Sequence, residues 1–193
     1  MKLRGLYAVT PDGPGVLEKV EEALEGGIAL LQYRRKARGS IDEAKALLAL
    51  SRRFGVPFIV NDDVGLALAI GADGVHLGRE DGDLAAARRQ LKGKVLGASC
   101  YDSTGLAKAA VAAGADYVAF GSVFSSPTKP AAVRAPLSLF QDFELPVCAI
   151  GGITLQNAPQ VIGAGADMVA VISDLFDAPD IKGRAAAYRK LFE

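Results

Sequence analysis

The pentapeptide Gly-Ala-Asp-x-Val occurs three times in the chain, beginning at Gly71, Gly114 and Gly165. Each copy leads into a short apolar run, as in GADGVHLG, GADYVAFG and GADMVAVI. Successive copies are separated by roughly twice the length of a strand followed by a helix, so the repeat predicts a fold built from βα units. Its aspartates stand at the start of the predicted strands, away from the ends where chemistry is expected. We therefore expect them to be structural.

Strand-like runs and helical stretches alternate along the whole chain. The predicted strands span residues 5–10, 29–34, 57–62, 74–78, 94–100, 117–121, 146–152 and 168–173. In the stretches between them, apolar residues recur at intervals of three and four, which is typical of helices. The predicted helices span residues 15–26, 40–54, 63–70, 83–91, 102–113, 136–142, 156–163 and 180–192.

Strands that are apolar on both faces, each followed by a helix, indicate a parallel sheet covered by helices. Eight such units predict a closed (β/α)8 TIM barrel, and no linker divides residues 1–193, so we expect a single domain. Similar βαβ units in the two halves, PFIVND with GADGVHLG and PVCAIGG with GADMVAVI, support closure. An open doubly wound sheet is the alternative, but no Gly-x-Gly-x-x-Gly follows the first strand.

Composition narrows the functions to consider. The 22 basic and 22 acidic residues balance, so no overall positive field favours nucleic acid or an anionic membrane. No apolar run reaches the roughly 18–20 residues of a membrane span, and we expect no signal peptide in the stretch MKLRGLYAVT, which is too short for one and has no cleavage site. Cys100 and Cys148 are expected to be reduced core thiols of a cytoplasmic protein. With His76 as the single histidine, the sequence favours neither zinc nor a Ser–His pair, and any metal would be bound by oxygen.

The second predicted strand ends in Gln32-Tyr33-Arg34-Arg35-Lys36. In a barrel, side chains at the carboxyl ends of the strands form the active site. Strand alternation sends Gln32, Arg34 and Lys36 to one side, where an amide and two cations suit a diphosphate. A solvated run of charges is the alternative interpretation. Tyr33 is expected to be a packing residue.

Carboxylates follow the third and fourth strands. The third strand ends in Asn61-Asp62-Asp63, and Asp81 comes shortly after the fourth. Asp63 is expected to cap the next helix, a task that Asp62 does not share if it points into the barrel mouth. Asp62 and Asp81 could together hold Mg²⁺ with waters and substrate phosphate oxygens. Asp81 could equally cap the helix that starts near Asp83.

The fifth and sixth strands are followed by further polar residues. Ser99 ends the fifth strand and is either a ligand at the mouth or a plain strand-end serine. The polar loop 121–130 contains Lys129 and suits a lid over an anion. Phe124 in this loop could form the wall of a ring-binding pocket. His76 lies inside the fourth strand and is expected to belong to the core or to the wall of the mouth.

The seventh and eighth strands end where barrels often bind phosphate. Gly151 and Gly152 follow the seventh strand, and Ile172 and Ser173 end the eighth. Backbone N–H groups of a glycine loop and of a helix N-terminus can form such a site.

Taken together, these strand ends resemble the thiamine-phosphate synthase family over nearly the whole chain, from GLYAVT to the final helix. The motifs that carry the resemblance are Gln32-Tyr33-Arg34-Arg35-Lys36, Asn61-Asp62-Asp63, the runs 74–81 and 120–130, and Ala149-Ile150-Gly151-Gly152-Ile153. Each motif is unspecific by itself, but all of them in this order are highly specific.

The resemblance implies a transferase that joins 4-amino-2-methyl-5-pyrimidinylmethyl diphosphate to a thiazole phosphate, giving thiamine phosphate and diphosphate. The implied ligands of the pyrimidine diphosphate are Gln32, Arg34, Lys36, Asn61, Ser99 and Lys129, with Tyr33 and Arg35 in the same motif. Those of the thiazole phosphate are Ser126, Pro127, Thr128, Gly152, Ile172 and Ser173. Mg²⁺ would be held by Asp62 and Asp81.

The same resemblance implies catalytic roles for Arg34, Lys36, Ser99 and Lys129. The cations would stabilise charge on the departing diphosphate, and the reaction needs no protein nucleophile. Arg79 and Cys100-Tyr101 depart from the common pattern, which has glutamine and Thr-His at these positions.

Two other functions are open at this point. A thiazole tautomerase has the same fold, but it carries a histidine where Ser122 stands and lacks the carboxylate of Asp62. A non-catalytic barrel that binds a phosphate ligand would not require two metal carboxylates opposite a cationic cluster. The sequence does not define the oligomeric state, and a homo-oligomer is compatible with it.

Overall fold

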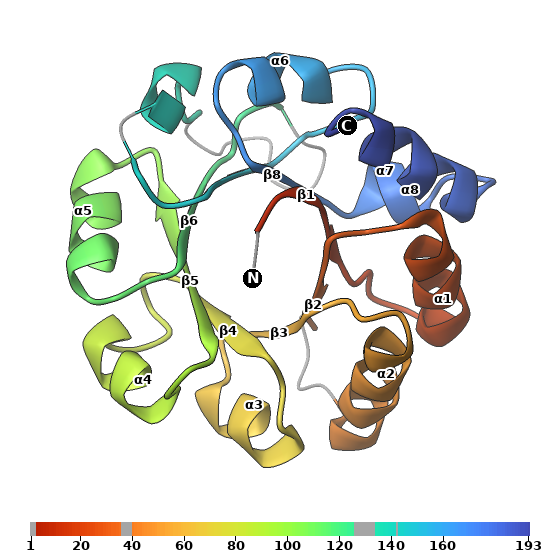
Figure 1. Ribbon diagram of the computed structural model, residues 1–193, viewed down its shortest axis with the longest axis horizontal. Helices are drawn as coiled ribbons and strands as arrows, with labels where there is room; N and C mark the ends of the chain where they lie inside the picture. Colours follow the sequence, from red (N-terminus) through yellow and green to blue (C-terminus); the bar gives the residue numbers. More distant parts are fainter. Residues whose placement is uncertain (1–2, 36–39, 126–133, 142) are drawn as a thin grey trace.

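The computed structural model describes residues 3–35, 40–125, 134–141 and 143–193. Eight parallel strands follow one another around a closed barrel, in which β8 pairs with β1. Figure 1 looks into this ring of strands and shows the helices arranged around it. The predicted (β/α)8 TIM barrel is confirmed.

The elements correspond closely to the predicted ones. The strands are β1 (Gly5–Val9), β2 (Leu30–Tyr33), β3 (Phe58–Asn61), β4 (Gly74–Leu77), β5 (Val95–Tyr101), β6 (Tyr117–Phe120), β7 (Val147–Ile150) and β8 (Met168–Val171). The helices are α1 (Val16–Gly26), α2 (Ile41–Arg53), α3 (Val64–Ile70), α4 (Leu84–Gln90), α5 (Thr104–Ala112), α6 (Ala158–Gly163), α7 (Ser173–Phe176) and α8 (Ile181–Lys190).

Two elements differ from the prediction. The stretch between β6 and β7 forms a 3₁₀ helix, η1 (Leu137–Gln141), in place of an α-helix. The short helix α7 directly after β8 was not predicted, because its four residues are too few to show a helical period. No helix among the described residues is long and apolar enough to cross a membrane.

Each aspartate of the Gly-Ala-Asp repeat ties the start of its own strand to the preceding strand. Asp73 Oδ2 accepts the backbone N–H of Phe58 at 2.9 Å, and the Asp73 N–H donates to the Phe58 carbonyl at 2.9 Å. The same pair of bonds joins Asp116 to Leu96 and Asp167 to Val147. The repeat is therefore structural and lies at the amino end of the barrel, opposite the mouth.

Replacing Asp167 with alanine is expected to lower the free energy of unfolding by about 1–3 kcal/mol, because the N–H of buried Val147 loses its acceptor. Asp167→Asn keeps an acceptor oxygen and should lose less. Urea unfolding of the two variants checks this order. Equal stability of Asp167→Ala and the parent chain would contradict the structural role.

Strand alternation divides the buried side chains into two layers. One layer fills the barrel interior and includes Tyr7, Ile59, Tyr117 and Met168. The larger layer lies between the strands and the surrounding helices. The interior also receives polar side chains, because Gln32, His76 and Ser99 occupy inward positions on β2, β4 and β5 and bond to the interior tyrosines or to one another.

Candidate active site at the carboxyl ends of the strands

A chain of hydrogen bonds crosses the barrel interior below the mouth. Gln32 Nε2 donates to the Tyr7 hydroxyl at 2.8 Å, and the hydroxyls of Tyr7 and Tyr117 are 2.8 Å apart. Tyr117 OH lies 2.9 Å from His76 Nδ1, and His76 Nε2 lies 2.8 Å from Ser99 Oγ. The chain thus connects two predicted ligands, Gln32 and Ser99, through residues from five different strands.

Burial keeps this chain of groups uncharged. It lowers the pKa of His76 to about 4, so the imidazole is neutral at pH 7. Burial also raises the pKa values of both Tyr7 and Tyr117 well above those of free tyrosine. The expectation that His76 belongs to the core or the mouth wall is confirmed by its 7% exposure. The partnership of the two tyrosines was missed, although a tyrosine inside a buried strand signals that its hydroxyl needs a partner.

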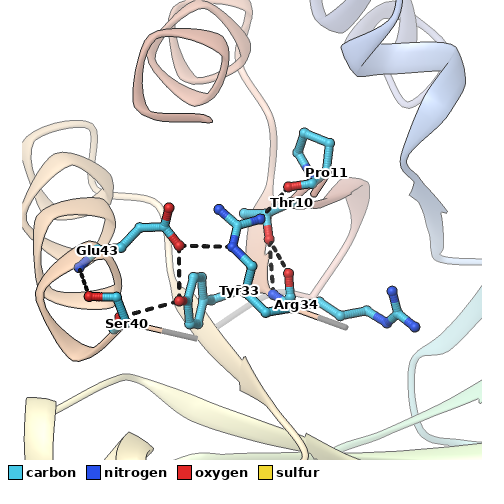
Figure 2. Close-up of polar contacts among 7 residues, drawn as sticks. Thr10, Pro11, Tyr33, Arg34, Ser40 and Glu43 are labelled. Atoms are coloured by element: carbon cyan, nitrogen blue, oxygen red, sulfur yellow. Dashed lines mark hydrogen bonds and ion pairs between the residues drawn. The ribbon is translucent and has the colours of Figure 1, made fainter. Parts of the chain in front are cut away.

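The first of the two arginines after β2 belongs to the barrel mouth. Thr10 Oγ1 accepts the Arg34 N–H at 2.9 Å and donates to the Arg34 carbonyl at 2.9 Å, which fixes the backbone there. In Figure 2 the Arg34 side chain extends away from Tyr33 and Glu43. Its charge lowers the pKa of Asp62, so the guanidinium lies near that carboxylate.

The second arginine lies in a different cluster, against α2. Arg35 Nε donates to Glu43 Oε1 at 2.8 Å, and the guanidinium also bonds to the Pro11 carbonyl and lies over the Tyr33 ring. The Tyr33 hydroxyl bonds to Glu43 at 3.0 Å, and Tyr33 is 3% exposed. Hydrogen bonds from Arg35 and Tyr33 lower the pKa of Glu43. The structure therefore does not bring Tyr33 and Arg35 together with Arg34, although all three are in the predicted substrate motif.

A pair of carboxylates stands at the ends of β3 and β4. Partial burial, together with the hydrogen bond to Asp81 and the charge of Asp81, raises the pKa of Asp62 to about 6, and that hydrogen bond places the two side chains next to each other. Asn61 Nδ2 donates to Asp62, and the Gly78 N–H donates to Asp81 Oδ2 at 2.8 Å. Asp62 has a left-handed backbone with φ of 64°, which aspartate tolerates better than most residues.

Neighbouring aspartates carry the helix caps. Asp63 accepts the Leu66 N–H at 2.7 Å and caps α3, as predicted. Asp83, not Asp81, caps α4 through the Ala86 N–H at 2.6 Å, so the alternative role for Asp81 is excluded. Among the described residues, no group of three or more His, Cys, Asp or Glu could hold a metal.

The glycine loop after β7 packs tightly against the segment that follows β6. Gly151 and Gly152 have φ values of 99° and 66°, and a Cβ at Gly152 would overlap the Ser125 carbonyl. Phe124 N–H donates to the Gly151 carbonyl at 3.0 Å, and Asn157 Nδ2 donates to the Gly152 carbonyl at 2.9 Å. The predicted ligands Lys36, Ser126, Pro127, Thr128 and Lys129 lie outside the described residues.

Asp174 holds α7, and with it Ile172 and Ser173, in place. Its Oδ2 accepts the Leu155 N–H at 3.1 Å and the Tyr188 hydroxyl at 2.8 Å. The same oxygen lies 2.6 Å from Arg184 Nη1 on α8. A single carboxylate thus connects α7 to α8 and to the segment that follows the glycine loop.

Replacing Asp174 with alanine is expected to lower the free energy of unfolding by about 1–3 kcal/mol, because the Leu155 N–H and the Tyr188 hydroxyl lose their acceptor and the partly buried Arg184 loses its carboxylate partner. Glu193→Ala, which removes the exposed ion pair with Arg189, should have little effect. Urea unfolding curves of both variants make the comparison. Similar losses in the two variants would contradict the anchoring role of Asp174.

Two residues that depart from the family pattern contact each other at the rim of the mouth. The Arg79 guanidinium lies over the Tyr101 ring, 4.8 Å from its centre, which is a cation–π geometry. Arg79 and Tyr101, which both differ from the family pattern, are therefore contact partners of each other.

Comparisons with known proteins show which proteins this chain is similar to. The family model TMP-TENI, thiamine monophosphate synthase, matches residues 6–175. The thiamine-phosphate synthase of Aromatoleum aromaticum is 60% identical over an alignment that covers 100% of this chain and 98% of that protein. A solved thiamine phosphate pyrophosphorylase from Pyrococcus furiosus is 37% identical with a TM-score of 0.88, covering 99% of this chain and 96% of that one.

A 3-hexulose-6-phosphate synthase structure is 18% identical with a TM-score of 0.79, covers 98% of this chain and 100% of that one, and shares the fold alone. The family match and the relatives, in contrast, extend over the strand ends that carry the predicted ligands. The chain therefore belongs to the thiamine monophosphate synthase family.

Proposed function

We propose that the barrel mouth transfers the 4-amino-2-methyl-5-pyrimidinylmethyl group from its diphosphate to 4-methyl-5-(2-phosphooxyethyl)thiazole, giving thiamine phosphate and diphosphate. As a member of its family, the chain is a transferase of the thiamine-phosphate synthase type. The observation that carries the proposal is the Asp62–Asp81 carboxylate pair beside Arg34, at the ends of three adjacent strands.

The carboxylate pair fits Mg²⁺. Both residues are exposed to solvent. Burial and the neighbouring Asp81 raise the pKa of Asp62, and a cation between the two carboxylates would relieve the part that comes from their mutual repulsion. Mg²⁺ commonly binds one or two carboxylates and completes its shell with waters and phosphate oxygens. When bound, the ion would neutralise charge on the diphosphate.

Side chains of the protein are proposed to bind the diphosphate and to position the aminopyrimidine. Arg34 offers a guanidinium to the departing diphosphate, and Lys36 and Lys129 are proposed to add ammonium groups. Ser99 and Gln32 are proposed to hold the aminopyrimidine, with Asn61 beside the diphosphate. The reaction then depends on positioning and on charge stabilisation, with attack by the thiazole nitrogen in place of a protein nucleophile.

The thiazole phosphate is assigned to the other side of the mouth. We propose that it binds backbone groups of Gly152, Ile172 and Ser173, together with Ser126, Pro127 and Thr128. The tight packing of Gly152 against Ser125 and the anchoring of α7 by Asp174 support this assignment, because both hold the loop backbone in a defined position.

The tautomerase alternative is less well supported. Ser122 Oγ donates to the Phe124 carbonyl at 2.7 Å, so this position holds a loop-stabilising hydroxyl and no imidazole. The tautomerase also lacks the carboxylate that Asp62 supplies in this chain. We further propose a cytoplasmic location, which the two free, buried cysteines support.

One experiment separates the alternatives. The purified chain is given both substrates with Mg²⁺, and thiamine phosphate and diphosphate are followed; a parallel sample receives the substrate of the tautomerase. Equimolar formation of both products supports the synthase. Conversion of the tautomerase substrate alone would overturn the proposal, and binding without any turnover would favour a non-catalytic barrel.

A further inference from the structure

The orientation of the Gln32 amide sets the direction of the interior chain of hydrogen bonds, and the number of available hydrogens then carries that direction along the chain. Gln32 presents its amide nitrogen to Tyr7, so the Tyr7 oxygen accepts there. A tyrosine hydroxyl has a single hydrogen. The Tyr7 hydrogen must therefore point to Tyr117, since among the described residues the Tyr117 hydroxyl is the other group within hydrogen-bond distance of it.

The same count then applies to the next two groups. Tyr117 accepts from Tyr7, so its own hydrogen points to His76 Nδ1, which must be unprotonated in order to accept it. A neutral imidazole then carries its proton on Nε2, and this N–H donates to Ser99 Oγ. In this order the hydroxyl hydrogens of Tyr7 and Tyr117 and the His76 N–H each find an acceptor.

The other orders leave a buried donor without an acceptor. If His76 Nδ1 carried a proton, Tyr117 would accept from His76 and would have to donate to Tyr7. The Tyr7 oxygen would then accept from both Gln32 and Tyr117, and its own hydrogen would have no partner within the chain of bonds. Buried hydroxyls without a partner are rare in proteins, because their desolvation is not compensated. Reversing every bond would require the Gln32 carbonyl oxygen to face Tyr7, where the structure has the amide nitrogen.

The packing around the chain holds its members in place. The His76 and Tyr117 rings stack with centroids 5.6 Å apart, and the Tyr7 and Tyr117 rings meet edge to face at 5.9 Å. Gly97 on β5 makes room for this arrangement, because a Cβ there would overlap the Tyr117 ring and hydroxyl. Rotation of Tyr117 or His76 away from these positions is therefore hindered.

We propose that Tyr7 and Tyr117 are positioning residues that hold His76 as its Nε2–H tautomer and so make Ser99 a hydrogen-bond donor toward the substrate. Ser99 accepts from His76, which leaves the serine hydrogen free, and Ser99 is partly exposed. The matching substrate group is an acceptor without a hydrogen, such as a ring nitrogen of the aminopyrimidine. This assignment of a substrate partner rests on the proposed function, whereas the tautomer does not.

The tautomer can be read directly, because the chain contains a single histidine. The full chain is labelled with ¹⁵N and studied without ligand at neutral pH by long-range ¹H–¹⁵N correlation of the imidazole. The expected result is a protonated Nε2 and an unprotonated, hydrogen-bonded Nδ1. A protonated Nδ1, or protonation of both nitrogens, would overturn the proposal. This measurement does not depend on turnover, so it separates failure of the inference from failure of the proposed function.

Tyr117→Phe removes the donor to Nδ1. The Nδ1 signal is expected to move toward that of an imidazole nitrogen without a hydrogen bond, and the KM for the pyrimidine diphosphate should rise roughly tenfold, the effect of losing one good hydrogen bond. The KM for the thiazole phosphate should stay unchanged. Tyr188→Phe is the matched control for the spectrum: it removes another buried hydroxyl, bonded to Asp174 outside the barrel, and should leave the His76 signals in place. An unchanged Nδ1 signal or an unchanged KM in Tyr117→Phe would contradict the positioning role.

Discussion

Asp62→Asn is expected to lower Mg²⁺-dependent turnover by about 10²–10³-fold while leaving the barrel folded. The substitution removes one of the two charges proposed for the metal and changes little else, since asparagine tolerates the left-handed backbone at this position. The loss should be greatest at low Mg²⁺ concentration and should shrink as Mg²⁺ is raised, because the weakened site then fills again.

The matched control is the same substitution one residue later. Asp63→Asn keeps a side-chain oxygen for the α3 cap, where asparagine serves as well as aspartate, and it should retain turnover. Initial rates of both variants over a series of Mg²⁺ concentrations make the comparison. Parent-like rates for Asp62→Asn at all concentrations would remove the metal assignment.

Arg34→Ala is expected to lower kcat/KM for the pyrimidine diphosphate by about 10²–10³-fold, because a guanidinium proposed for the leaving diphosphate is lost. Its neighbour provides the contrast. Arg35→Ala should keep turnover within a few fold and instead destabilise the fold, since Arg35 pairs with Glu43 and covers Tyr33. Steady-state kinetics and urea unfolding of both variants test this division. A larger loss of turnover in Arg35→Ala than in Arg34→Ala would show that the placement of the two side chains is wrong.

These two arginines also show how far the sequence could be interpreted. Strand alternation already separates Arg34 from Arg35 and Tyr33, and the structure agrees with it. The family motif, which extends over all five residues 32–36, does not make that distinction. The alternation of a strand predicts which side of the sheet a side chain faces. A family motif predicts only which stretch of the chain contacts the substrate.

Patterns within a few neighbouring residues were sufficient to predict the helix cap at Asp63 and the positions of the strands. Asp63 was recognised as a cap because its partner lies three residues away, and the repeat located β4, β6 and β8. The bond between Tyr7 and Tyr117 could not be predicted, because it joins β1 to β6 across the barrel and no local pattern specifies a partner at that distance. The anchoring role of Asp174 could not be predicted for the same reason, because its partners Leu155 and Tyr188 lie in another loop and another helix.

The most direct test of the proposed activity is a single time course with Mg²⁺ removed and then restored. The purified full chain receives both substrates in the presence of a chelator, and Mg²⁺ is added in excess later. Thiamine phosphate and diphosphate should then appear in equal amounts, and only after the addition. Product formation before Mg²⁺ is added, or none after it, would contradict the assignment of this mouth as a Mg²⁺-dependent synthase site.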